Sequence, residues 1–229
     1  MTTPFITNVA NHLYGKLFLT EPAMLITNEK RNYFDNLIDS ILTNPSGEEI
    51  NFDFQYPKHE FLRYLTRQKK LLFHGSNHLN ITELIPKPQS DWKGRPIKAV
   101  FASGDGIWPM FFATVQHTNY RGSFRNGCFV IRDNGKEESR YYFFSLNMEY
   151  KDKEPWQDGM IYLLPKEGFH QTSTGNVRFD EWANPQIVRP ISKLRVSPED
   201  FPFKNLVSWH DEKEKIYISW LKYKKRIKN

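Results

Sequence analysis

The hydrophobic pattern of the chain changes at residue 71. Before it, apolar residues recur at helical spacing, as in NYFDNLIDSIL (32–42), where Phe34, Leu37, Ile38 and Ile41 share one face. After it, short apolar runs alternate with turn residues, and the regular strand–helix alternation of a parallel sheet is missing. This change predicts an α+β fold rather than a parallel α/β sheet.

The first 70 residues are mainly helical in pattern. The stretch YPKHEFLRYLTRQKK (56–70) begins with a proline suited to a first helical turn, and Phe61, Leu62 and Leu65 form its apolar face. We therefore expect residues 1–70 to form an N-terminal helical extension and residues 71–229 to form the main domain.

Short apolar segments after residue 70 predict strands, and two longer segments predict helices. The helices are expected in GIWPMFFATVQ (106–116) and in the C-terminal EKEKIYISWLKYKKRIKN (212–229). The strands are expected in LLF (71–73), AVFA (99–102), GCFVIRD (127–133), RYYFFSL (140–146), GMIYLLP (159–165) and QIVRPISKLRV (186–196).

The sequence also excludes several classes of protein. Cys128 is the only cysteine, which rules out an internal disulfide and a cysteine-based zinc site and favours a reducing cytoplasm. His78, His117, His170 and His210 lack metal-ligand spacing and are interpreted as surface residues, so we expect no metal. The N-terminus lacks the pattern of a signal peptide, and no apolar stretch approaches the roughly 20 residues of a membrane helix. We expect a cytoplasmic protein that does not bind membranes.

Three stretches place chemically useful residues beside predicted strands. They are LFHGS with His74, AVFASGDGIWPMFFA (99–113), and RFDEWANPQIVRP (178–190) with Glu181. Taken alone, His74 is better explained as a structural histidine that caps a turn than as a ligand residue, and Glu181 as an ordinary carboxylate at the start of a strand. Asp180 is the rival carboxylate and is interpreted as a turn residue. Asp105 is expected to cap the helix of the second stretch.

The order and spacing of these stretches resemble the ADP-ribosyltransferase superfamily, in its diphtheria-toxin and poly(ADP-ribose)-polymerase branch, over roughly residues 71–203. The resemblance implies a core of two packed, mainly antiparallel sheets and NAD as the co-substrate. It implies that His74 hydrogen-bonds a ribose hydroxyl of NAD, that the Gly75 backbone binds the nicotinamide amide, and that Ser76 lies beside it. A glycine also allows a ligand to approach bare backbone.

The same resemblance assigns the catalytic residue and one aromatic residue. Glu181 would bind the nicotinamide ribose and stabilise an oxocarbenium-like transition state, and Phe111 or Phe112 would stack on the nicotinamide ring. The chain departs from the family at Val100, which aligns with a tyrosine of the second motif. Valine cannot hydrogen-bond, so Ser103 or a loop group would have to replace that tyrosine.

The acceptor of the ADP-ribose is predicted from basic and aromatic residues. Arg178 and Phe179, in the loop before Glu181, are suited to pairing a phosphate and stacking a base, although Phe179 is equally suited to anchoring the loop. Arg121 and Arg125 flank Phe124 in a similar pattern. With a formal net charge of +6 and a basic C-terminal tail, this pattern favours a nucleic acid acceptor.

The predicted function is therefore transfer of ADP-ribose from NAD to nucleic acid, with RNA favoured over DNA. The resemblance suggests a bacterial toxin or phage-defence effector, for which an antitoxin partner is expected. Two alternatives stay open at this point. The same chemistry can act on a protein acceptor, or the chain can be a non-catalytic module that binds NAD, ADP-ribose or RNA.

Overall fold

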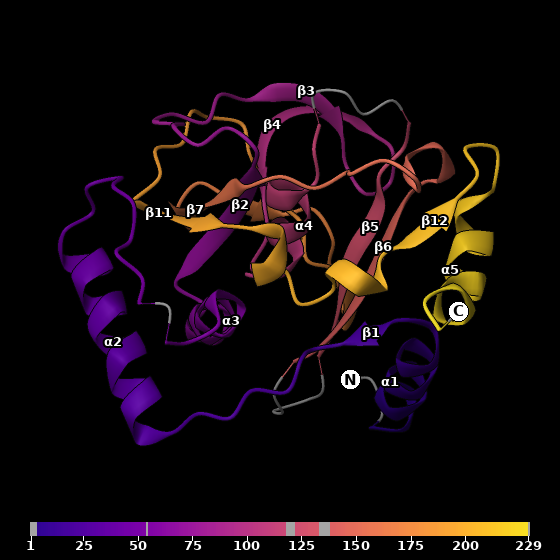
Figure 1. The fold of residues 1–229 in the computed structure, drawn as a ribbon, viewed down its shortest axis with the longest axis horizontal. Helices are drawn as coiled ribbons and strands as arrows, with labels where there is room; N and C mark the ends of the chain where they lie inside the picture. The colour runs from indigo at the N-terminus through magenta and orange to yellow at the C-terminus, as the bar shows by residue number, and fades with distance from the viewer. Residues whose placement is uncertain (1–3, 54, 118–121, 133–137, 229) are drawn as a thin grey trace.

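The computed structural model describes residues 4–53, 55–117, 122–132 and 138–228 (Figure 1). Within these ranges the protein combines helices with mainly antiparallel sheets, which confirms the α+β class. The α-helices are α1 (Pro4–Leu17), α2 (Asn28–Thr43), α3 (Lys58–Gln68), α4 (Trp108–Thr114) and α5 (Ile216–Arg226). Short 3₁₀ turns occupy Met148–Tyr150, Pro198–Asp200 and Lys204–Leu206.

The largest sheet has its strands in the order β1-β6-β5-β9, with β12 pairing in parallel beside β6. Its other pairs are antiparallel. The helices α1 and α5 pack against each other and against this sheet, as Figure 1 shows. The strands are β1 (Leu19–Thr20), β5 (Arg125–Ile131), β6 (Ser139–Asn147), β9 (Val177–Phe179) and β12 (Ser208–His210).

The remaining strands form two smaller antiparallel sheets, β3-β4-β10-β8 and β11-β7-β2. Two sheets were expected, and the described residues form three. The smaller two touch through one bridge, between Phe73 and Ser103, because β4 otherwise pairs with β3 and β10. Their strands are β2 (Leu71–Ser76), β3 (Lys87–Ser90), β4 (Pro96–Ala102), β7 (Gly159–Pro165), β8 (His170–Gln171), β10 (Trp182–Asn184) and β11 (Ser192–Val196).

Local sequence explains where several helices begin and end. Thr27 accepts a hydrogen bond from the Lys30 backbone N–H at 3.2 Å and so caps α2. Lys69 adopts the left-handed conformation that ends α3. Asp105 accepts hydrogen bonds from the backbone N–H groups of Ile107 and Trp108, at 3.0 and 2.6 Å, which confirms its predicted role as the cap before α4.

One buried apolar cluster joins the N-terminal segment to the rest of the protein. Phe18, Phe34 and Phe61 from that segment belong to the same cluster as Phe73 of β2 and Phe143 of β6. The short strand β1 also pairs with β6. The helices α2 and α3 lie on the side of β2 and β11, away from α1 and α5 (Figure 1). The domain boundary at residue 70 stays a prediction.

Candidate functional site

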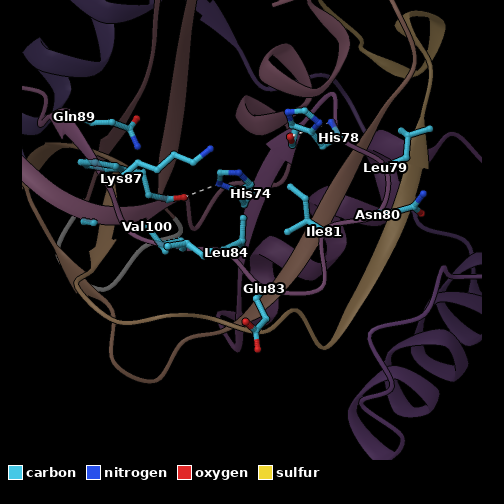
Figure 2. A pocket seen from close by; sticks show the side chains of 14 residues that line it. His74, His78, Leu79, Asn80, Ile81, Glu83, Leu84, Lys87, Gln89 and Val100 are labelled. Carbon is cyan, nitrogen blue, oxygen red and sulfur yellow. Dashed lines mark hydrogen bonds between the residues drawn. The ribbon is translucent and has the colours of Figure 1, made fainter.

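A groove opens where β2 and β4 diverge beyond the Phe73–Ser103 bridge. It has two lobes that share His74, Ser76, Lys87 and other lining residues. The lobe beside α4, which we call the α4 lobe, measures about 530 Å³. The lobe beneath residues 78–85, which we call the loop lobe, measures about 560 Å³ (Figure 2). Each is large enough for a small-molecule ligand.

His74 lies between the two lobes. Its Nδ1 is 2.8 Å from the Phe101 carbonyl oxygen, drawn as a dashed line in Figure 2. A carbonyl can only accept, so Nδ1 carries the proton. In the neutral ring Nε2 is an acceptor, and it has no hydrogen-bond partner among the described residues. Burial lowers the pKa of His74, and the nearby Lys87 ammonium lowers it further, although the hydrogen bond to Phe101 opposes them. The imidazole is therefore neutral at pH 7 and can accept a hydrogen bond from a hydroxyl.

Gly75 is required by the packing of α4 against β2. A Cβ at this position would lie 1.9 Å from the Pro109 carbonyl oxygen, so no larger residue fits. This reason differs from the approach of a ligand that the sequence suggested, but the backbone of Gly75 also faces the α4 lobe. Phe73 exchanges both backbone hydrogen bonds with Ser103. In an antiparallel strand the backbone groups alternate in direction, so the Gly75 N–H and C=O point to the same side as those of Phe73, past the end of the bridge.

Ser76 and Ser103 both line the α4 lobe. The Ser76 hydroxyl accepts a hydrogen bond from the His78 N–H at 3.1 Å, and the buried Ser103 hydroxyl accepts one from the Asp105 N–H at 3.0 Å. Each hydroxyl keeps its own proton for a further bond. Val100 is buried and contributes only apolar surface to the loop lobe, so Ser103 is the hydroxyl on this segment that faces the groove.

Phe111 and Phe112 have different environments. Phe112 lines the α4 lobe. Phe111 is fully buried and packs against Phe144 and Phe201, with ring centroids 5.0 and 6.1 Å away. Of the two, only Phe112 can therefore contact a ligand, and Phe111 is a core residue.

Glu181 lies in the turn between β9 and β10 and reaches the α4 lobe. Its Oε1 accepts hydrogen bonds from the Thr172 hydroxyl at 2.7 Å and from the Trp92 backbone N–H at 3.2 Å. Burial raises the pKa of this carboxyl, and these two bonds partly offset the rise. Both bonds go to Oε1, which leaves Oε2 without a hydrogen-bond partner among the described residues.

A buried ionic cluster lies beside Glu181. Asp180 lies in the same turn as Glu181, as predicted, but it is 2% exposed. It accepts a hydrogen bond from the Trp182 indole N–H and lies 3.8 Å from the Arg140 guanidinium. Arg140 also contacts Asp105 at 3.4 Å. Burial raises the pKa of Asp105 to about 6, against the opposing charge of Arg140. The cluster thus connects the cap of α4 to the turn that carries Glu181.

Two of the predicted acceptor-binding residues, Arg178 and Arg125, bond other residues of the protein. Arg178 is buried and hydrogen-bonds Glu138 at 2.9 Å, because the pairing of β9 with β5 turns its side chain inward. Arg125 donates a hydrogen bond to the Ser219 hydroxyl of α5 at 2.8 Å, so its guanidinium also contacts another part of the fold. Neither arrangement supports the predicted contact with a phosphate. Arg121 lies outside the described residues, and Phe179 packs among other aromatic rings.

The four histidines interpreted as surface residues divide into two groups. His78, His117 and His170 are exposed, and the first two lie at the edge of the α4 lobe. His210 is fully buried, which corrects the prediction, because β12 pairs with β6 and places its ring between the hydroxyls of Ser145 and Ser123. Burial lowers the pKa of His210 to about 4.

Sequence reasoning missed several residues that line the groove. Lys87 and Gln89 come from β3, whose four residues are all exposed and give no apolar signal. Because they are two apart on a strand, both point to one side. Trp108 and Gln157 complete the wall of the α4 lobe. The sequence pattern predicts the helix that contains Trp108, but it does not predict which side of that helix faces the groove.

The described residues contain no group of three or more histidine, cysteine, aspartate or glutamate side chains that could hold a metal ion. Among the same residues, we find no helix with the length and apolarity needed to cross a membrane. Comparison of the chain with protein-family models, with curated proteins and with solved structures found no match.

Proposed function

We propose that the protein is an ADP-ribosyltransferase that uses NAD as its co-substrate. The observation that carries this proposal is the convergence of distant segments on the α4 lobe. His74, Gly75 and Ser76 come from β2, Phe112 from α4, and Glu181 from the turn before β10. The resemblance in sequence assigned these residues to NAD, and their arrangement around one groove is consistent with that assignment.

The groups that line the groove match the chemical parts of NAD. The Gly75 N–H and C=O offer one donor and one acceptor, which suits a carboxamide, and Phe112 offers a ring for the nicotinamide. Nε2 of His74, an acceptor in the neutral ring, suits a ribose hydroxyl. Lys87, between the lobes, suits the diphosphate, and it forms no ion pair with the described residues. The loop lobe, which is lined by both apolar and polar side chains, would then hold the adenosine.

Glu181 supplies the charge that the reaction needs. Loss of nicotinamide takes the bonding electron pair with it and leaves positive charge on the ribose, as in glycoside cleavage. A carboxylate fixed by Thr172 and Trp92 stabilises that charge without reorganising. Its raised pKa also favours proton transfer from the incoming nucleophile.

For the acceptor we propose a nucleic acid, with RNA favoured over DNA, and for the biological role a toxin or defence effector controlled by an antitoxin. The net charge of +6 supports a polyanionic acceptor. The alternatives are a protein acceptor and a non-catalytic module that binds NAD, ADP-ribose or RNA.

The test is incubation with NAD labelled in its adenylate half and with separate pools of RNA, single-stranded DNA, duplex DNA and protein. Wild type and Glu181→Gln are compared, and free nicotinamide is measured. We expect label in RNA or DNA and a loss of about 10²-fold or more in the variant, the effect of removing a transition-state charge. Label in protein would show that the acceptor is a protein rather than a nucleic acid, while the proposed transfer of ADP-ribose from NAD would stand. If neither label transfer nor nicotinamide release occurs, the transferase proposal is wrong.

A further inference from the structure

Trp92 is an exposed aromatic residue beside Glu181. It lies in the turn between β3 and β4, and the residue is 42% exposed. Its backbone N–H donates to Glu181 Oε1 at 3.2 Å, and its indole N–H donates to the Thr172 carbonyl at 3.2 Å. The indole is therefore held in place at the carboxylate, although much of its surface faces solvent.

Other aromatic rings support the indole from one side. Phe179 stacks on Trp92, with centroids 6.1 Å apart and planes 10° apart. Phe179 is itself braced edge-on by Trp108 at 5.3 Å and by Phe129 at 5.0 Å. Because Trp108 lines the α4 lobe, the aromatic row runs from the wall of the proposed NAD site to the exposed indole. Phe179 supports this row rather than facing a ligand itself.

The turn around Trp92 is basic. The Lys93 ammonium lies 4.9 Å from the Trp92 ring centroid. The Arg95 side chain is 63% exposed although it pairs with Asp91, and Lys98 follows on β4. Asp91 is the only acidic residue between positions 87 and 98, and it is buried. Lys93 lies over the ring of Trp92 as a flexible side chain, so a planar or charged partner can take its place on that face.

We propose that Trp92 is a platform on which an unpaired base of a single-stranded nucleic acid stacks, with Lys93 binding the adjoining phosphate. The base displaces Lys93 from the ring, and the freed ammonium pairs with the backbone of the strand. This inference rests on the proposed function, because that function makes the strand the acceptor and places it next to Glu181.

Two features favour a single strand over a duplex or a protein. A flat, fixed indole stacks any base, but a duplex keeps the faces of its bases covered. The exposed charged side chains of residues 87–98 are all cations, which suit phosphates rather than the mixed charges of a protein surface. Lys93 is assigned the phosphate because Arg178 and Arg125, which the sequence predicted for that role, hydrogen-bond Glu138 and Ser219 instead.

The test measures binding directly, without NAD, so that its outcome does not depend on catalysis. The probes are fluorescein-labelled 20-mers of RNA and of DNA with the same mixed sequence, and the corresponding duplexes, followed by anisotropy at several salt concentrations. The variants are Trp92→Leu, Trp92→Phe and Lys93→Gln. Tyr217→Leu on α5 is the matched control, because Tyr217 is 50% exposed and lies beside the basic C-terminal residues.

We expect Trp92→Leu to weaken single-strand binding by about 5- to 150-fold, the value of one base–aromatic stack. Trp92→Phe keeps a flat ring and should recover most of the affinity, which excludes a folding defect as the cause. Lys93→Gln should reduce the slope of log affinity against log salt by about 0.7, the value of one phosphate contact on a single strand. The difference between RNA and DNA probes identifies which strand the platform prefers.

Equal binding by wild type and Trp92→Leu would overturn the inference. So would equal binding of duplex and single strand, or a loss in Tyr217→Leu instead, which would place the binding surface on α5. Wild-type protein that binds through Trp92 but releases no nicotinamide would contradict the proposed function while it supports the platform. Wild-type protein that cleaves NAD but binds neither RNA nor DNA single strands would support the NAD chemistry and contradict the platform.

Discussion

Replacement of Gly75 by alanine tests the contact between β2 and α4 that shapes the groove. The added Cβ would lie 1.9 Å from the Pro109 carbonyl oxygen and 3.1 Å from the Ala113 nitrogen. Ordinary contact begins near 3.4 Å, so α4 would have to move by about 1.5 Å. Both near atoms belong to the backbone of α4, and a rotamer change cannot relieve the clash.

The expected cost is about 3–5 kcal/mol, above the usual 1–3 kcal/mol for overpacking, because a whole helix must shift and its buried side chains lose contacts. For a chain of this length, that corresponds to a fall in Tm of about 6–20 °C. Differential scanning calorimetry measures it. Gly15→Ala in α1 is the matched control: its Cβ meets nothing closer than 3.8 Å, and alanine should stabilise the helix by about 0.5–1 kcal/mol. A Gly75→Ala protein that melts within about 2 °C of wild type would refute the reasoning.

Two further predictions concern charged residues. Lys87→Met should weaken NAD binding about tenfold, because it removes a charge-assisted contact, whereas the control Lys98→Met should leave the affinity unchanged. Isothermal titration calorimetry measures both affinities. If Lys87→Met binds NAD as tightly as wild type, Lys87 does not contact NAD. Burial opposes ionisation of Glu138, but Arg178 and Arg140 outweigh it and lower its pKa from 4.5 to about 2. Its stabilisation, up to about 3 kcal/mol, is therefore present above pH 4.5 and lost as the pH falls towards 2. Urea unfolding of Glu138→Gln should show that loss already at pH 7 and a flatter dependence between pH 4.5 and 2; a parallel pH dependence would contradict it.

Apolar periodicity predicted elements well where one face of the element is buried. The strand expected at 159–165 is β7, and the helix expected at 56–70 contains α3. It failed for β3, because all four residues of that strand are exposed and leave no alternation to detect. Lys87 and Gln89 were missed for the same reason.

The candidate site was also predictable only in part. The sequence by itself determined which residue types were present and in which order: a histidine and glycine at the end of an apolar strand, a helix that starts after Asp105, and a glutamate before a late strand. Only the tertiary structure decided which of them share a cavity. Phe111 and Phe112 are neighbours in sequence, but consecutive helical residues point in directions about 100° apart, so packing alone turned one into the core and the other towards the groove.

The same reason accounts for the predictions about charge and exposure that were wrong. Arg178 and His210 look like surface residues in sequence, but each lies on a short strand whose pairing partner determines which side chains turn inward. Trp92 carried no signal because its importance comes from contacts with Glu181 and Phe179, about 90 residues away. Local patterns determine helices and strands, since their hydrogen bonds and periodicity are local, whereas a site is built from distant segments and depends on how the sheets pack.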